Sequence, residues 1–207
     1  MIGLIGVKVG MTQIFDEQGA VIPVTVIKIN DNVVVSERTE EKDGYSAALI
    51  GSVDKKNPTK PYAGQFPKGV APKRYCTEIK DFEGEYAVGD SLSMDLLENV
   101  TYVDVIGTCK GKGYQGVVRR HGFAGGRKTH GSKFHRANGS TGMAAWPSRV
   151  IKGTKMPGRM GNSRVTVQNL KLVKVDKEKK VVLVKGAVPG TRNSMVFIRS
   201  AVKKENG

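Results

Sequence analysis

No aspartate or glutamate occurs between Asp104 and Asp176, and this gap of 71 residues limits how the chain can fold more than any other feature. The gap holds fifteen lysines and arginines, whereas the other 19 basic residues are balanced by the chain's 19 acids, so the net charge of +15 lies in one stretch. Cations without acidic partners repel one another and keep a segment extended until a polyanion neutralises them. The fifteen are Lys110, Lys112, Arg119, Arg120, Arg127, Lys128, Lys133, Arg136, Arg149, Lys152, Lys155, Arg159, Arg164, Lys171 and Lys174. We therefore expect a neutral folded body with one cationic segment that inserts into nucleic acid.

The composition of the same interval favours an extended loop over a second core. It contains 13 of the 26 glycines, all three histidines and the only tryptophan. Over 107–161 no hydrophobic period of 2 or 3.6 residues is sustained, apart from a possible short helix near 114–120. A connection of this length is normally functional or disordered. We predict a basic, Gly-rich extension over 111–161.

The remainder of the chain is predicted to be mainly β. Its β-branched runs are short and end at Gly, Asn or Asp, a pattern typical of a barrel or sandwich. Expected strands cover 21–29, 33–35, 45–50, 75–82, 100–106, 165–167, 170–175, 181–184 and 195–199, with a hairpin turn at 176–180. We predict a closed β-barrel body built by both ends of the chain, from residues 1–53, 96–110 and 162–207. Residues 54–95, interrupted by four prolines, are predicted to form a smaller irregular insertion with short strands.

The cysteines and the hydropathy of the sequence indicate the cellular compartment of the protein. Cys76 and Cys109 fit neither a disulfide framework nor a CxxC metal pair, which suits a reducing cytoplasm, and we expect both to be small buried packing residues. The N-terminal residues are broken by Gly and Lys, so they lack the continuous apolar core of a signal peptide. No stretch approaches the ~18–20 apolar residues of a membrane span. The basic segment also lacks a long amphipathic helix that could lie on a membrane, so no membrane partner is expected.

Residues 111–116, GKGYQG, match the GxGxxG pattern and follow an expected strand. A dinucleotide site would need a crossover helix and an acid ~20 residues further on. A kinase loop would need catalytic and metal-binding acids downstream. The next acid is Asp176. We therefore expect these glycines to let backbone amides and lysines approach phosphates, and we expect no cofactor.

The aromatic and imidazole groups of the basic segment also suit nucleic acid. His121, His130 and His135 lie among cations without the acids or thiols that a metal site would want, so we expect neutral hydrogen-bond donors to phosphate, sugar or base, and no metal. Trp146 is flanked by loop-like basic sequence, which favours stacking or wedging against RNA over the alternative, a core anchor.

The lack of acids argues against catalysis as well. An enzyme that acts on RNA usually needs a carboxylate as general base or metal ligand. We predict a protein that is not an enzyme and has no small-molecule substrate. An RNA-modifying enzyme and a DNA-compacting protein remain as alternatives, to be separated by turnover and by relative affinity for duplex DNA and folded RNA.

Several motifs resemble those of the bacterial ribosomal protein L3 (uL3) family, in the family's order and nearly from end to end. The fullest is 97–120, with Asp104, Gly107, the run Gly111-Lys112-Gly113, Gly116 and Arg120. The others are 6–13 (GVKVGMTQ), 130–136 (HGSKFHR), 156–161 (MPGRMG) and 184–190 (VKGAVPG). The resemblance is therefore carried by motifs in both the β segments and the basic segment.

The resemblance implies a structural constituent of the large (50S) ribosomal subunit in the cytoplasm. It implies a primary 23S rRNA-binding protein near the rRNA 3′ end that helps nucleate subunit assembly, with ribosomal proteins L14 and L19 as neighbours. The implied fold is a six-stranded translation-factor-type barrel, with a loop over 123–155 that reaches toward the peptidyl-transferase centre and a tip near 142–147. The residues expected to bind rRNA are Lys8, Lys110, Lys112, Arg119, Arg120, His121, Arg127, Lys128, His130, Lys133, His135, Arg136, Trp146, Arg149, Lys152, Lys155, Arg159 and Arg164.

The sequence departs from the family pattern at two positions. Cys109 stands where the signature usually has Ser or Thr, which is expected to alter one hydrogen bond and not the fold. Some members carry a methylated glutamine at the loop tip, and the matching position here is Ala145. We therefore predict that this modification is absent.

Overall fold

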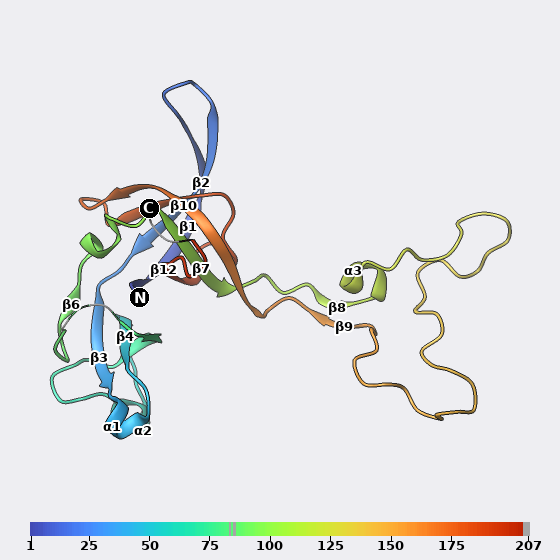
Figure 1. Ribbon diagram of the computed structural model, residues 1–207, viewed down its shortest axis with the longest axis horizontal. Helices are drawn as coiled ribbons and strands as arrows, with labels where there is room; N and C mark the ends of the chain where they lie inside the picture. The colour runs from blue at the N-terminus through green and yellow to red at the C-terminus, as the bar shows by residue number, and fades with distance from the viewer. Residues whose placement is uncertain (83, 85, 205–207) are drawn as a thin grey trace. The chain divides into compact units, whose positions relative to one another are not determined.

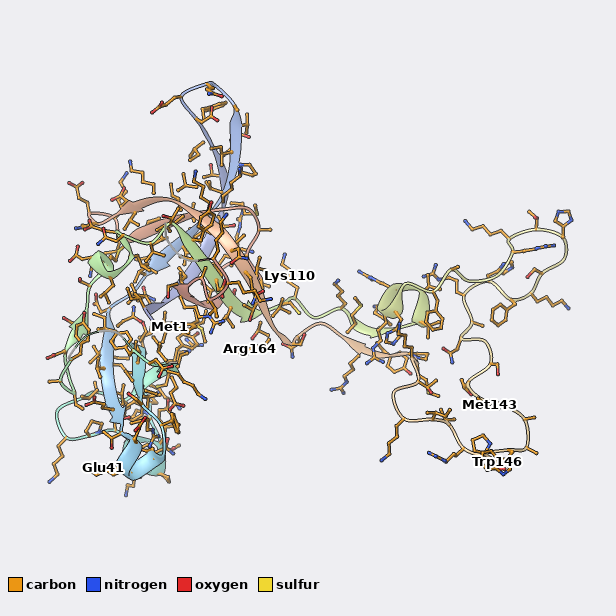
Figure 2. All side chains as sticks on the ribbon, viewed as in Figure 1. Met1, Glu41, Lys110, Met143, Trp146 and Arg164 are labelled. Carbon is orange, nitrogen blue, oxygen red and sulfur yellow. The ribbon has the colours of Figure 1, made fainter. Side chains whose placement is uncertain are left out.

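The computed structural model describes residues 1–82, 84 and 86–204, and within them the chain is mainly β (Figure 1). It divides into two units: Met1–Cys109 with Arg164–Gly207, which we name the body, and Lys110–Ser163, which we name the basic unit. Lys110 and Arg164, labelled in Figure 2, mark where the chain passes from one to the other. The domain boundaries expected from the sequence also run through residues 83, 85 and 205–207, which lie outside the described residues; those boundaries stay predictions.

Six strands of the body hydrogen-bond into a closed barrel in the order β1-β12-β7-β10-β11-β2. Every neighbouring pair is antiparallel. The strands are β1 (Gly3–Phe15), β2 (Val21–Ile29), β7 (Tyr102–Thr108), β10 (Arg164–Asp176), β11 (Val181–Lys185) and β12 (Met195–Ser200). The first and last strands close the ring, with Gly3 opposite Arg199 and Val7 opposite Met195. The ring therefore joins both ends of the chain, as the sequence predicted.

A second sheet of the body has the order β5-β4-β3-β6. Its strands are β3 (Asn32–Arg38), β4 (Ala47–Asp54), β5 (Lys73–Lys80) and β6 (Ser91–Leu92). The connections carry the short helices α1 (Glu40–Asp43) and α2 (Lys60–Ala63) and the 3-10 helix η1 (Met94–Leu97).

Within residues 1–53, β3 and β4 belong to the second sheet and not to the ring. A β-branched run predicts a strand but does not choose its partner. The buried Asn32 lies where the chain leaves the ring. Its amide accepts from the Ile5 N–H at 2.9 Å and donates to the Ile5 carbonyl at 3.1 Å, so the start of β3 is tied to β1. From there β3 pairs with β4 and β6.

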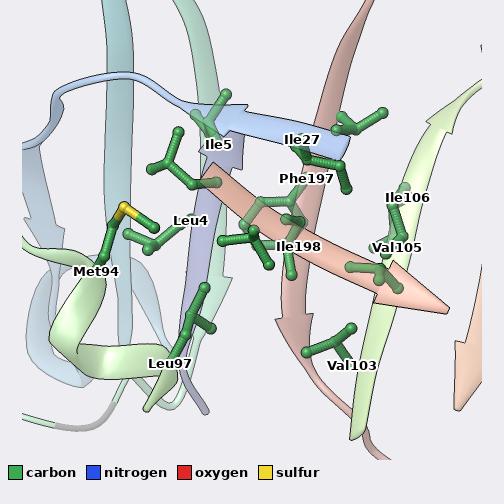
Figure 3. Packing of buried hydrophobic residues seen from close by; sticks show 14 of the residues in the cluster. Leu4, Ile5, Ile27, Met94, Leu97, Val103, Val105, Ile106, Phe197 and Ile198 are labelled. Atoms are coloured by element: carbon green, nitrogen blue, oxygen red, sulfur yellow. The ribbon is translucent and has the colours of Figure 1, made fainter. Parts of the chain in front are cut away.

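The buried side chains of the two sheets form one hydrophobic cluster (Figure 3). Leu4, Val105 and Ile198 contribute from the ring, and Ile50 contributes from the second sheet. Each fully buried aliphatic side chain of this size stabilises the fold by roughly 1.5–3 kcal/mol. The body therefore has a hydrophobic core built from both of its sheets.

Cys76 was expected to be buried and is instead exposed, whereas Cys109 is half-buried; neither residue forms a disulfide. Cys76 lies on β5, the edge strand of the second sheet, where burial alternates along the strand. Its neighbours Tyr75 and Thr77 take the more buried face, so Cys76 takes the outer one.

The basic unit contains three short elements and long loops. These are β8 (Gly113–Gln115), α3 (Val117–His121) and β9 (Gly158–Met160). No helix or strand occurs over 122–157. The helix expected near 114–120 begins at Val117, because the preceding residues pair with β9 instead. None of the helices in the described part of the chain is long and apolar enough to cross a membrane.

Candidate nucleic-acid interface

The structure leaves most of the predicted contact residues open to solvent. Sixteen of the eighteen have exposed side chains, and only Lys8 and His121 are half-buried. Fifteen of the exposed residues belong to the basic unit, and the remaining one, Arg164, begins β10 of the body. The exposed residues are Lys110, Lys112, Arg119, Arg120, Arg127, Lys128, His130, Lys133, His135, Arg136, Trp146, Arg149, Lys152, Lys155, Arg159 and Arg164.

Several cations of the body are paired with acids, whereas the cations of the basic unit have no acid within the unit. The body's ion pairs include Lys73 with Asp54 at 2.7 Å, Lys180 with Asp31 at 2.7 Å and Arg199 with Asp104 at 3.3 Å. The basic unit has twelve lysines and arginines and no acid. Across the described residues, none of its cations takes part in an ion pair. Such a surface attracts polyanions, and nearby phosphates would satisfy its guanidinium and ammonium donors.

The two short strands hold the ends of the basic unit together. β8 and β9 pair with Tyr114 opposite Arg159, and the Lys112 N–H donates to the Met160 carbonyl at 2.9 Å. Gly161 has a φ of +75°, and a Cβ there would lie 2.2 Å from the Lys110 carbonyl oxygen. Only glycine fits at that position without a clash. The glycines of this motif thus allow two backbone segments to approach each other.

Helix α3 is held against residues 156–158, where the loop ends and β9 begins. The Arg120 guanidinium donates to the Met156 carbonyl at 2.8 Å, and the His121 imidazole Nε2 lies 3.0 Å from the same oxygen. A Cβ at Gly158 would come within 2.4 Å of the Arg120 Nη1, so the guanidinium packs directly on that glycine. Arg120 and His121 therefore have a positioning role within the unit, in addition to the predicted RNA contact.

A second close approach forms a small cationic loop. The Gly126 N–H donates to the His135 carbonyl at 3.1 Å, and the His135 imidazole Nδ1 lies 2.9 Å from the Arg127 carbonyl oxygen. A Cβ at Gly126 would lie 1.9 Å from the Phe134 carbonyl oxygen, so the contact requires glycine. Arg127, Lys128, His130 and Lys133 lie on the loop that this contact closes. These four residues are close together in the sequence, and in the structure they lie on the same small loop.

Trp146 belongs to another loop of the basic unit, together with Met143 (Figure 2). Its side chain is 85% exposed and Met143 is also exposed, which contradicts the alternative of a core anchor. A large exposed indole among cations can stack on a base or fill a space between RNA helices. Ala145 precedes it, so this loop carries no glutamine side chain at that position.

Sequence reasoning assigned Lys8 to RNA and overlooked Tyr114. The Lys8 ammonium group donates to the carbonyls of Val188 and Gly190, at 2.7 and 3.2 Å, and so fixes a turn of the body. Tyr114 is strongly exposed on β8, opposite Arg159, and can offer a stacking surface beside a cation. Its position next to glycines and close to Lys112 could have indicated this role.

The geometry also bears on the alternative chemistries. β8 pairs with β9 in an antiparallel two-stranded sheet, and α3 has five residues. A dinucleotide fold needs a parallel sheet with a full crossover helix, so that interpretation of GKGYQG is wrong. Among the described residues, no group of three or more His, Cys, Asp or Glu side chains could hold a metal ion.

A nearly neutral β body with one Gly-rich unit of exposed, unneutralised cations is typical of a structural protein that binds a polyanion. The sequence model of the family described as "Ribosomal protein L3" matches residues 76–181. A large ribosomal subunit protein uL3 of Treponema denticola is 52% identical over 206 residues, covering 99% of each chain. The uL3 of Treponema pallidum strain Nichols is 53% identical over 207 residues, covering 99% of this chain and 100% of the relative. That of Borreliella burgdorferi strain ZS7 is 52% identical, covering 98% and 100%.

The chain belongs to the uL3 family of ribosomal proteins. This is a family of structural, non-enzymatic proteins of the large ribosomal subunit, located in the cytoplasm in bacteria, and rRNA binding is typical of it. The resemblance found in the sequence motifs is thereby confirmed, and so is the prediction that the protein is not an enzyme.

Proposed function

We propose that this protein is a structural constituent of the large ribosomal subunit that binds 23S rRNA near its 3′ end and helps nucleate subunit assembly. The proposal rests above all on the twelve lysines and arginines of the basic unit, which have no acid within the unit to pair with. The family membership supports it, because the relatives are named as large-subunit proteins. The eighteen predicted residues remain our candidates for contact with rRNA.

In this proposal the body fixes orientation and the basic unit threads between rRNA helices. Its cations replace the counterions that crowd around closely packed phosphates, and their release favours binding. Glycine-permitted backbone approaches at Gly126 and Gly161 hold the loops in shape. Recognition is mainly of RNA shape, 2′-hydroxyls and phosphates, so base readout is minor. The loop over 123–155 reaches toward the peptidyl-transferase centre, with Trp146 at its tip.

Several finer features belong to the same proposal. The closed ring of six strands is of the translation-factor type, and residues 54–95 and 111–161 are insertions into that fold. Ribosomal proteins L14 and L19 are neighbours in the subunit. The protein carries no methylated glutamine at the loop tip, because the matching residue is Ala145.

The salt dependence of binding tests the electrostatic part. If ~8–10 cations meet phosphates, log affinity for a folded 23S rRNA fragment should fall against log salt with a slope of about −6 to −9. Replacing Lys133, Arg136, Arg149, Lys152, Lys155 and Arg159 by glutamine should flatten the slope. A matched control replaces exposed lysines of the body, Lys42, Lys56, Lys60 and Lys179, and should leave it unchanged. An unaltered slope in the first variant would reject this assignment.

Co-sedimentation tests the assembly part. The chain should remain with large subunits in a stoichiometric amount after a high-salt wash. At matched salt it should bind folded rRNA more tightly than duplex DNA; equal affinities would favour a DNA-compacting protein. Turnover of an RNA substrate that disappears on loss of one Asp, Glu, His or Cys would favour an RNA-modifying enzyme.

A further inference from the structure

The hairpin of β1 and β2 continues past the barrel as a ribbon of two strands (Figure 1). β12 pairs with β1 only from Gly3 to Val7, and β11 pairs with β2 only from Val24 to Lys28. Beyond these limits, as far as Phe15 opposite Val21, the two strands pair only with each other among the described strands. A two-stranded ribbon is at best marginally stable in water. A surface packed against it would stabilise this part of the fold.

One face of the ribbon is apolar and exposed. Phe15 and Val21 lie directly opposite each other and are 66% and 55% exposed, and Met11 is 51% exposed. Met11, Gln13 and Phe15 alternate along β1, so all three project from the same side, with Pro23 opposite Gln13. Gln13 separates Met11 from the exposed apolar side chains of Phe15, Val21 and Pro23, and exposed apolar side chains gathered in this way mark an interaction site.

The charges of the ribbon differ in sign from those of the basic unit. Residues 9–27 contain two charged side chains, Asp16 and Glu17, and no lysine or arginine. Asp16 shapes the turn, because its Oδ1 accepts the N–H groups of Gln18 and Ala20 at 3.1 and 2.7 Å. Glu17 is exposed beside it. A surface with only negative charge is repelled by phosphates, so the ribbon suits a protein partner and not RNA.

We propose that the outer β1–β2 ribbon, residues 9–23, docks onto a neighbouring protein that presents an apolar groove with lysine or arginine beside the hairpin turn. Phe15, Val21 and Met11 fill the groove, and Glu17 faces the partner's cations. Both charge and hydrophobicity point to such a partner, since interface cores are apolar with large side chains and their rims are polar. The inference rests on the proposed function, which places the protein among basic ribosomal proteins.

Photo-crosslinking in assembled large subunits tests this docking site. The full chain with benzoylphenylalanine in place of Phe15 is incorporated into subunits, irradiated, and the crosslinked peptide is identified by mass spectrometry. We expect one protein partner, joined through a segment with apolar residues and nearby lysine or arginine. Crosslinks to rRNA alone, or no crosslinks in subunits that contain the chain, would overturn the docking site and leave the proposed function intact. Failure of the labelled and unlabelled chains to co-sediment with subunits would overturn both.

Affinity measurements with the crosslinked partner give a second readout. Glu17→Lys should weaken binding of the full chain roughly tenfold or more, because it removes one ion pair and introduces a like charge. Phe15→Ser should weaken it by a similar factor. Glu41→Lys on α1 and Val88→Ser are the matched controls, because both positions are exposed and lie outside the ribbon; they should stay within about twofold. Equal effects of Glu17→Lys and Glu41→Lys would refute the proposed contact.

Discussion

The body and the basic unit of this protein differ in how far their cations are paired with acids and in how much apolar surface they bury. The body buries Leu4, Ile50 and Ile198 in one cluster and pairs several of its cations with acids. The basic unit buries one side chain, Val117, among its short elements, and it has no acid at all. The body can therefore gain its stability from its own residues, whereas the basic unit needs an external polyanion to offset the repulsion among its cations.

The two acids that flank the acid-free interval both have structural roles in the body. Asp104 is buried in the body, where its Oδ1 accepts the Asn169 N–H at 3.0 Å and its Oδ2 accepts from Arg199 at 3.3 Å. Asp176 shapes the β10–β11 turn by accepting the Lys179 N–H at 3.0 Å. Both carboxylates serve the folding of the body. Acids are retained where the body needs them and are absent from the stretch that we propose meets RNA.

Hydrogen exchange of the free protein should give the largest contrast between the regions. Residues 123–155 contain few backbone hydrogen bonds, so their amides should exchange at close to unprotected rates. Amides in the paired part of β7 should be slower by about a thousandfold or more. Slow exchange over 123–155 without RNA would break the comparison. Adding a folded rRNA fragment should slow it selectively.

A core substitution should have the next largest effect. It should lower the free energy of unfolding by several kcal/mol. Leu4→Ala removes a fully buried side chain and should lower the free energy of unfolding by about 2–5 kcal/mol, measured by urea denaturation. Ile151→Ala in the basic unit, where the side chain is half exposed, is the matched control and should change it by less than about 0.5 kcal/mol. Similar losses would mean that the basic unit shares the body's core.

Replacing the buried carboxylate of Asp104 should have the third largest effect, also on the free energy of unfolding. Asp104→Asn keeps the shape of the side chain and removes its negative charge beside Arg199. We expect the free energy of unfolding to fall by about 1–3 kcal/mol, because the guanidinium loses its charged partner. Asp16→Asn at an exposed turn is the comparison variant. A smaller loss for Asp104→Asn than for Asp16→Asn would contradict the structural role of Asp104.

The exposed ion pair between η1 and the β10–β11 turn should give the smallest effect. The hydrogen bond from Lys177 lowers the pKa of Asp95, and the same contact raises the pKa of Lys177. A lowered carboxyl pKa contributes stability above its ordinary value of 3.8 that is lost as the pH falls through the lowered pKa. A raised lysine pKa contributes stability below 10.5 that is lost as the pH rises through the raised value.

Between those limits Lys177→Ala should therefore shift the urea midpoint slightly downward. Because the pair is solvent-exposed, the shift should also shrink with added salt. Lys179→Ala, an exposed neighbour, serves as control and should show neither dependence. A Lys177→Ala shift that does not vary from pH 2 to pH 11 would exclude this contribution.

Much of the body could be predicted from local pattern, but strand β1 could not. Its sequence has glycines and a lysine at Gly6, Lys8 and Gly10, which weaken a strand signal. In the structure Gly6 is necessary, because a Cβ would lie 2.8 Å from the Ile27 side chain. The glycine that hides the strand in the sequence thus permits close packing inside the barrel. The membership of β3 and β4 in the second sheet was hidden for a related reason, since pairing depends on distant residues.

The cationic character of the candidate interface follows from the sequence more directly than the strand pairing of the body does. The lack of acids between Asp104 and Asp176 is visible in the sequence, and charge repulsion does not depend on which strands pair. The sequence by itself therefore determined the cationic segment, its Gly-rich character and the family. Only the tertiary structure decided that Lys8 serves a turn of the body, that Arg120 packs on Gly158, and that Phe15 and Val21 share one exposed face. The physical reason is that net charge sums along the chain, whereas a contact depends on which distant residues folding brings together.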